Sequence, residues 1–573
     1  MPTDLHRAPA ALEIEDPPKE HRKGITRLTV DVPSSYRPVD TDGPKPPSRW
    51  KTPEFWVYYV VFAFAVPWMV WVPVSLSRTS YLNYNLYRHR LARGWLFGRE
   101  VDNSDLQYRG FRSNIPALTL LLSAFFALKF IYTRAAPSAA ADRLHLVPFY
   151  ALFSVLMLFV LHGTSTLKVL LILTVNYALT KAAAGRQWGV AATWLFNCGI
   201  LFLNERYHGY TFASAHPALA SLDAWRGVYP GWHVSFNITM LRLVSFSMDH
   251  HWACARAGPP PPDPGSALSD KERVRAAHPP EAYSFVNYIA YALYAPLYIA
   301  GPILTFNDFL WQLARPAVSP STTRRGVTHY ALRFLGTLLT MELVLHFMYV
   351  VAIKDTRAWG GDSAAELSMV GFWNLIIVWL KLLLPWRFFR LWALLDGIDP
   401  PENMVRCVAN NYSTLGFWRS WHRSYNLWIV RYIYIPLGGT RRLALSSFLI
   451  FSFVALWHDL SFRLLAWSWL VTLFILPEIV ARQVLPASKY AARPWHRHVC
   501  ALGAVCNVLM MMAANLVGFV LGTDGMKYMA HEIGGSWAGL RFLLVACACL
   551  FVGVQVMFEY REEEMRRGIY RRC

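Results

Sequence analysis

The stretch FLIFSFVALWHDLSFRLLAWSWLVTLF runs from Phe448 to Phe474 and is almost entirely apolar. A membrane-spanning helix needs ~20 consecutive, mostly apolar residues, and this stretch holds large parts of two such segments. Its centre nevertheless carries His458, Asp459 and Arg463. An ionisable side chain near the bilayer interior costs ~2.5 kcal/mol or more by insertion scales. The stretch therefore predicts a membrane protein in which the ionisable residues between the two segments have a function.

The composition of the whole chain is that of a membrane protein. Of its 573 residues, 55% are hydrophobic, 15% aromatic and only 16% charged, and the mean hydropathy is positive. These values favour an all-α polytopic membrane protein over a soluble enzyme. We expect a bundle of about 10–12 transmembrane helices with re-entrant or interfacial helices. The segments of suitable length and polarity are 56–76, 115–131, 146–162, 167–180, 188–203, 284–304, 330–353, 367–385, 443–458, 460–481, 499–521 and 540–559.

The two ends of the chain are polar. The first fifty residues are rich in proline and charge and lack an apolar stretch, so we expect no cleavable signal peptide and no stable structure there. The net charge of +20 comes from basic residues beside apolar segments, as in 78–112 and 561–572. This distribution is typical of contact with membrane lipid and does not indicate nucleic-acid binding. The predicted organisation is a tail (1–54), a membrane domain (55–560) and a basic tail (561–573).

Two apolar regions are interrupted. PGWHVSFNITMLRLVSFSMDHHW (230–252) carries Asn237, Arg242 and Asp249, so we expect a re-entrant or interfacial helix. YALYAPLYIAGPILTFNDF (291–309) contains two prolines and a glycine inside one apolar run, which predicts a broken helix.

Chemistry is indicated by GFWRSWHRSYNLWIVRYIYIPLGG, residues 416–439. On a single helix, His422 and Asn426 would join Arg419 in one polar stripe. An aromatic stripe would run beside it, and its members are Trp418, Trp421, Tyr425, Trp428 and Tyr432. The stripe alone is also typical of an interfacial aromatic belt, and His422 alone of a hydrogen-bonded structural histidine.

His458 supplies a second imidazole 36 residues after His422. It could simply bond a backbone carbonyl. An imidazole beside a carboxylate and away from bulk water is, however, suited to act as a general base, because its pKa lies close to working pH. The eight cysteines form no CxxC pair, and no histidines have ligand spacing, so we expect neither a disulfide framework nor a metal site.

These residues resemble a known family. The run FWRSWHRSYNLWIVRYIYIPLGG, followed by an apolar segment ending ALWHD, strongly resembles the membrane-bound O-acyltransferase (MBOAT) superfamily. The segments 75–116 and 236–252 resemble its fungal glycerol-uptake-protein branch. The resemblance extends from about residue 55 to the C-terminus. It implies a helical bundle around a central tunnel, and transfer of an acyl group from a thioester to a hydroxyl or amine.

The resemblance also implies the site residues. His458 matches the histidine of the family's WH pair, and His422 matches its upstream catalytic partner. The residues that would orient the catalytic groups or stabilise the oxyanion are Asn426, Arg419, Trp421, Trp457 and Asp459. Many members of the family have glycine where this chain has Asp459. Acyl-CoA would be a co-substrate and no cofactor would stay bound. Its phosphates need cations at the membrane face, and the candidates for acyl-CoA binding are Arg387, Arg390, Arg423, Arg431 and Tyr432, each of which could instead anchor the chain in the membrane.

The branch implies a more specific function. It is associated with remodelling of glycosylphosphatidylinositol (GPI) anchors in the endoplasmic reticulum membrane, where a long saturated acyl chain is placed on the lyso-lipid. The expected partners are membrane lipids, acyl-CoA and lyso-GPI or GPI-anchored proteins. Two alternatives remain: a protein or polysaccharide acceptor, and a proton-coupled glycerol or polyol transporter. The absence of an internal repeat disfavours the transporter.

Overall fold

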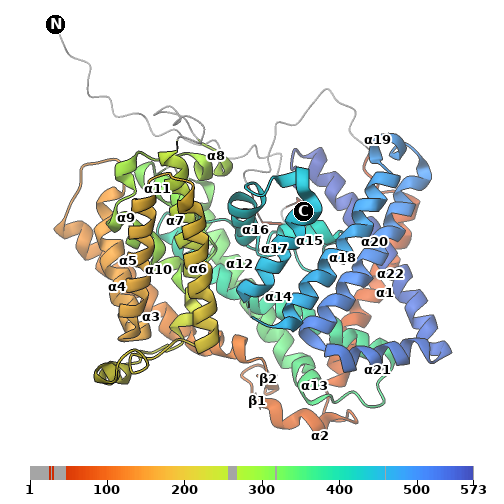
Figure 1. Cartoon of the computed structure of the whole chain (residues 1–573). Coiled ribbons are helices and arrows are strands. Elements are labelled where there is room, and N and C mark those ends of the chain that lie inside the picture. Colours follow the sequence, from red (N-terminus) through yellow and green to blue (C-terminus); the bar gives the residue numbers. More distant parts are fainter. Residues whose placement is uncertain are drawn as a thin grey trace.

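The computed structural model describes residues 25–26, 29–30, 32, 47–255, 268–316, 319–458 and 460–571. Within these ranges the regular structure is helical apart from two short strands, which form one antiparallel hairpin (Figure 1). The all-α polytopic fold is therefore confirmed. Strand β1 (Leu91–Arg93) pairs with β2 (Glu100–Asp102), with Leu91 opposite Asp102.

Nine helices in the described ranges are long and apolar enough to cross a membrane. Each coincides with an apolar segment predicted from the sequence, because an uninterrupted apolar run of this length satisfies its backbone hydrogen bonds only as a helix. They are α1 (Pro53–Leu76), α3 (Leu106–Ala135), α4 (Val147–His162), α5 (Ser165–Ala183), α12 (Arg324–Phe347), α14 (Ala364–Leu395), α18 (Phe462–Val484), α20 (Pro494–Asn515) and α22 (Trp537–Arg566).

The other predicted segments behave differently. Segment 188–203 forms α6 (Trp188–Tyr207), and segment 443–458 forms the shorter apolar helix α17 (Leu443–His458). The remaining helices are α2 (Tyr84–Tyr87), α7 (Trp232–Cys254), α8 (Asp270–Arg275), α9 (Phe285–Ala292), α10 (Ala295–Tyr298), α11 (Phe306–Ala314), α13 (Val350–Thr356), α15 (Thr414–Ser420), α16 (Arg423–Ile429), α19 (Ala487–Tyr490) and α21 (Gly522–Gly534).

Helix α7 corrects one prediction. Residues 232–254 form one continuous helix that is buried at every position from Thr239 to His250, and not a re-entrant or interfacial segment. Its polar residues find partners inside the protein. Arg242 donates to the carbonyl oxygens of Ala292 (3.0 Å) and Leu297 (2.5 Å). A polar helix can therefore lie at the centre of the bundle, because protein groups replace water around it.

The same arginine explains the helix break predicted at residues 291–309. Helix α9 ends at Ala292, α10 covers only Ala295–Tyr298, and α11 starts at Phe306. The interruption leaves the carbonyl of Ala292 without a helical partner, and Arg242 bonds it. Arg242 also bonds the carbonyl of Leu297, which accepts the N–H of Gly301 as well. The predicted break is confirmed, and it lies in the protein core.

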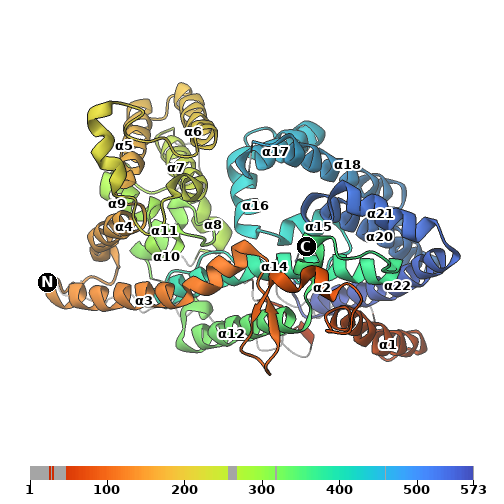
Figure 2. The ribbon, with the colours of Figure 1, turned by 90° about the horizontal axis from the view of Figure 1, so that it is seen from below.

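The helices form two groups. Figures 1 and 2 both place α4–α7 and α9–α11 on one side and α15–α18 and α20–α22 on the other. Aromatic contacts join the groups, because Trp194 of α6 meets Phe453 of α17 with ring centroids 5.8 Å apart. Helices α16 and α17 thus contact the first group through Trp194.

The ends of the chain pack together at the end of α22. This helix continues to Arg566, so the basic tail predicted from Arg561 begins inside it. Its Glu564 forms a buried ion pair with Arg406, which bonds both carboxylate oxygens at 3.1 and 2.5 Å. Thr29 Oγ1 also contacts Glu564 at 3.5 Å, and Thr29 is buried. Thr29 and its described neighbours Thr26, Val30 and Val32, all in the tail predicted to be unstructured, are therefore packed against the protein, and most of residues 1–46 lie outside the described ranges.

Candidate active site

His422 lies at a break in the chain and not on a continuous helix. Helix α15 ends at Ser420 and α16 begins at Arg423, while His422 has φ +44°, in the left-handed region. This conformation costs a non-glycine residue roughly 1–2 kcal/mol, so surrounding contacts must hold it. The prediction of one stripe from Trp418 to Tyr432 is wrong, because the break changes the direction of the chain after Trp421.

Aromatic rings surround the imidazole of His422. The ring of Trp386, from α14, stacks on it with centroids 4.5 Å apart and planes 24° apart. Tyr425 lies at 5.2 Å and Trp457 at 6.5 Å. The side chain itself remains partly accessible. These flat rings fix the plane of the imidazole and leave one part of it open.

His458 is the last residue of α17. Its side chain is exposed, whereas Trp457 beside it is buried. Trp457 Nε1 donates to the carbonyl of Asn237 on α7 (2.9 Å), and Asn237 Nδ2 donates to the carbonyl of Trp457 (3.3 Å). This reciprocal pair fixes the end of α17 against the central helix. His458 is thus held by its neighbour while its own imidazole stays accessible.

The structure brings the two histidines together around one tryptophan. The ring of Trp457 lies 4.7 Å from that of His458 and 6.5 Å from that of His422. Trp457 and Tyr425, 4.6 Å apart, form the apolar wall next to them. Two accessible imidazoles beside such a wall can hold a proton and a polar reacting group next to an apolar chain.

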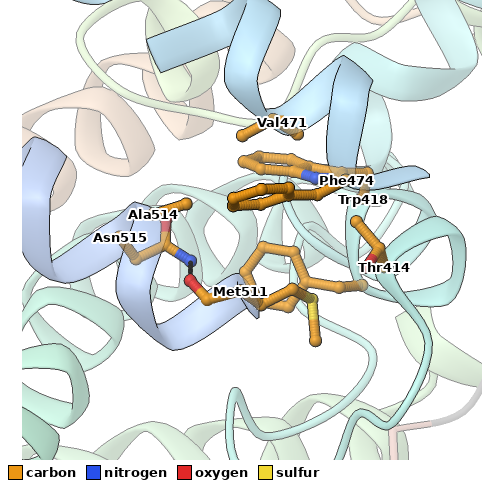
Figure 3. Close-up of a pocket in the computed structure, with 8 residues that line it drawn as sticks. Thr414, Trp418, Val471, Phe474, Met511, Ala514 and Asn515 are labelled. Carbon is orange, nitrogen blue, oxygen red and sulfur yellow. Dashed lines mark hydrogen bonds between the residues drawn. The ribbon is translucent and has the colours of Figure 1, made fainter. Parts of the chain in front are cut away.

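A small cavity borders the helix that precedes His422. Figure 3 shows side chains of α15, α18 and α20 converging on it. Its volume of about 10 Å³ gives room for one water molecule. Phe417 lines it and stacks on Trp421 at 5.4 Å. The predicted acyl tunnel therefore stays a prediction. The lining residues are Thr414, Phe417, Trp418, Val471, Phe474, Met511, Ala514 and Asn515.

Comparison with known proteins identifies the chain. The profile of MBOAT, the membrane-bound O-acyltransferase family, matches residues 188–523, a range that includes both histidines. The chain belongs to this family. The acyltransferase activity expected from the sequence is thereby confirmed, and the protein is a multi-pass membrane enzyme.

Several relatives of the acyltransferase are similar over nearly its whole length. It is 45% identical to Membrane-bound O-acyltransferase GUP1 of Saccharomyces cerevisiae over 537 residues, 92% of this chain and 94% of the relative. It is 41% identical to gup1 of Schizosaccharomyces pombe over 511 residues, 87% of this chain and 86% of the relative. The expected fungal branch is confirmed. A more distant match is the mouse Protein-cysteine N-palmitoyltransferase HHAT, 28% identical over 285 residues, which are 46% of this chain and 55% of that protein.

The residues predicted to support the acyltransferase histidines lie around the same turn. Asn426 donates its backbone N–H to the carbonyl of His422 at 3.1 Å. Trp421 stacks on Phe417, and Arg419 is exposed on α15. Their roles in orientation or oxyanion stabilisation stay predictions. Asp459 lies outside the described residues.

Two of the arginines predicted to bind acyl-CoA lie on α14 and bond other parts of the protein. Arg390 pairs with Asp399 (2.6 Å) and Glu402 (3.6 Å). Arg387 is buried and donates to Thr337 Oγ1 at 2.5 Å. Two carboxylates already neutralise Arg390, so its surroundings argue against a phosphate-binding role.

Arg431 and Tyr432 belong to another buried network. Both reach Asp249 of α7, Arg431 Nη2 at 2.7 Å and the Tyr432 hydroxyl at 3.0 Å. The ring of Trp252 stacks on Tyr432 at 5.7 Å. These contacts join the chain that follows α16 to α7, so the geometry favours a structural role for Arg431 and Tyr432. Arg423 is only partly buried and follows His422 directly, and it remains the candidate for a phosphate contact.

The variant Tyr432→Phe distinguishes a structural role of Tyr432 from a role in binding acyl-CoA. We expect this variant of the acyltransferase to lose about 1–2 kcal/mol of stability, because Asp249 loses one hydrogen bond. The KM for acyl-CoA should stay within about twofold, since the ring and Arg431 remain. Thermal unfolding and steady-state kinetics in detergent would measure both quantities. Tyr434→Phe is the matched control, because the Tyr434 hydroxyl has no hydrogen bond within the described part of the chain. A several-fold rise in KM without loss of stability would instead support acyl-CoA binding by Tyr432.

Four residues that contact the site were not predicted as site residues. Three of them come from other segments of the chain, so their spacing carries no signal, whereas Tyr425 lies three residues after His422. Trp386 and Tyr425 contact the imidazole of His422 directly. Asn237 and Asn403 bond the backbone beside each histidine. The two asparagines are polar residues inside apolar or buried surroundings, which is the one feature that could have drawn attention to them.

Proposed function

We propose that this acyltransferase moves a long saturated fatty acyl group from acyl-CoA to a hydroxyl of a lyso-phosphatidylinositol lipid, the lipid part of GPI anchors, in the endoplasmic reticulum membrane. The observation that carries the proposal is the convergence of His422 and His458 on Trp457. The similarity to proteins named membrane-bound O-acyltransferases supports an oxygen acceptor. The likeness of segments 75–116 and 236–252 to the branch supports the lipid.

His458 takes the role of general base. Its accessible imidazole removes the proton from the acceptor hydroxyl as the oxygen attacks the thioester carbonyl. A carbon–oxygen bond forms, the carbon–sulfur bond breaks, and the coenzyme A thiolate leaves with the proton that His458 has taken. General-base catalysis is typically worth 10²–10⁴-fold.

His422 takes the role of oxyanion donor. Stacked on Trp386, its imidazole is oriented before the reaction, and a neutral ring can donate one N–H to the carbonyl oxygen. Each such donor is worth about 3 kcal/mol. Asn426 and Arg419 are the next candidates, because they flank the same turn. The apolar rings of Tyr425 and Trp457 keep water from the thioester.

The acceptor class is the part of the proposal most open to test. The partial match to a protein-cysteine N-palmitoyltransferase favours a protein acceptor as the second candidate. A polysaccharide acceptor has no comparable support. Membership of an acyltransferase family favours the enzyme over a proton-coupled polyol transporter.

The test uses the purified full chain in nanodiscs. Labelled saturated acyl-CoA would be offered with a lyso-phosphatidylinositol, a lyso-phosphatidylcholine and an acceptor peptide in separate reactions. We expect labelled product with the first lipid only, and none with His458→Ala. Product on the peptide alone would replace the proposed acceptor. Absence of transfer to any acceptor, together with saturable glycerol flux into liposomes, would contradict the enzyme assignment.

A further inference from the structure

A buried segment holds the turn that carries His422 in position. Residues 396–413, here called the connector, join α14 to α15. Within it, Asn403 is completely buried. Its backbone carbonyl accepts the N–H of Arg423 (3.0 Å), and its side-chain Oδ1 accepts the N–H of Ser424 (3.1 Å). The two residues that follow His422 are thus held by one asparagine from elsewhere in the chain.

These bonds replace an ordinary helix cap. His422 is the N-cap residue of α16, a position whose side chain usually bonds the first free N–H groups of the helix. The His422 side chain makes no capping bond within the described structure. Asn403 satisfies the N–H groups of Arg423 and Ser424 instead. The imidazole of His422 is therefore not used as the cap of α16.

The connector and the turn are also bonded to other parts of the protein. Arg406, three residues after Asn403, forms the buried ion pair with Glu564 of α22. On the other side, Ser424 Oγ accepts the N–H of Ile303 at 2.8 Å, which ties the turn to the broken α9–α11 region. The turn is thereby connected to both groups of helices. A change of the Asn403 side chain removes the bond to the Ser424 N–H and leaves the backbone bond to Arg423 and these anchors in place.

We propose that Asn403 is a positioning residue for His422: its Oδ1 fixes the left-handed turn, and so the direction of the imidazole relative to His458. This inference rests on the proposed role of His422 as oxyanion donor. Misplacement of a catalytic group by about 1 Å can cost 10²-fold in rate. The effect should therefore fall on kcat, because substrate binding does not use Asn403.

The experiment compares three variants of the full chain in nanodiscs. Asn403→Ala removes the acceptor for the Ser424 N–H, and we expect kcat to fall about 10–100-fold with KM for acyl-CoA within about threefold. Asn403→Asp keeps an acceptor oxygen of the same shape, and a carboxylate is favourable at a helix N-terminus, so it should regain at least about fivefold of that loss. Asn411→Ala is the matched control, since Asn411 is buried in the same connector and its side chain, among the described residues, bonds the carbonyl of Cys407 (3.1 Å).

Thermal unfolding of each variant separates positioning from folding. We expect Asn411→Ala to keep wild-type kcat even if its stability falls as far as that of Asn403→Ala. A kcat of Asn403→Ala within twofold of wild type would overturn the inference, as would equal losses in all three variants. His422→Ala distinguishes this failure from that of the proposed function. If His422→Ala keeps full activity, the role of His422 fails; if it loses activity while Asn403→Ala does not, only the role of Asn403 fails.

Discussion

His458→Ala is expected to lower the rate of acyl transfer by about 10²–10⁴-fold, the range of a lost general base. Within the described part of the chain the exposed side chain of His458 contacts the ring of Trp457, so its truncation should change the stability by no more than about 0.5 kcal/mol. Free imidazole added to this variant should restore part of the rate, because the site is accessible. Transfer of labelled acyl groups and thermal unfolding, measured on one preparation, would check each expectation.

A histidine outside the site provides the control for this prediction. His496 lies at the start of α20, where its ring contacts Cys500 and the carbonyl of Leu485. His496→Ala should keep transfer within about twofold of wild type, since no catalytic role falls to it. Should His458→Ala instead unfold or vanish from the membrane while His496→Ala does not, His458 would be structural, and the assignment of the base would be wrong.

The second large effect concerns stability. Glu564→Gln is expected to lower the free energy of unfolding by about 3–5 kcal/mol, because it leaves Arg406 buried without its charge partner. The side chains of Arg406 and Glu564 are 0% and 2% exposed. Arg571 also lies 3.4 Å from Glu564 and would lose its partner too. Denaturant or thermal unfolding in detergent would measure the loss, and activity would fall with the folded fraction.

An exposed ion pair gives the matched comparison for Glu564. Arg357 and Asp524 lie 4.0 Å apart, with their side chains 73% and 72% exposed. Surface pairs of this kind are worth about 0–1 kcal/mol, so Asp524→Asn should be nearly neutral. If both changes cost the same, burial of the Arg406–Glu564 pair would not be what stabilises the ends of the chain.

Much of the fold followed from apolar patterning. Nine of the predicted segments are long apolar helices, and the break at 291–309 was predicted from its prolines and glycine. The prediction for α7 was wrong because Arg242 and Asp249 looked too polar for the bundle interior. Their partners, the carbonyls of Ala292 and Leu297 and the side chain of Arg431, lie about fifty residues or more away. Local sequence cannot show that such groups will be satisfied.

The site was only partly predictable for a similar reason. His422 and His458 were selected by their residue type and by the motif around them. Their neighbours Trp386, Asn237 and Asn403 were not, because each is ordinary in its own segment. The arginines at 390 and 431 were selected for their charge, which does not reveal that Asp399 and Asp249 already neutralise them.

The amino-acid sequence by itself determined that this chain is a helical membrane protein and which two imidazoles carry its family motif. Length and apolarity decide membrane insertion segment by segment, so they can be read locally. Only the tertiary structure decided that the helix around His422 breaks, that the ring of Trp457 lies near both histidines, and that Asn403 bonds the turn. Those features depend on contacts between residues far apart in the chain, whose free energies exist only after the helices have packed.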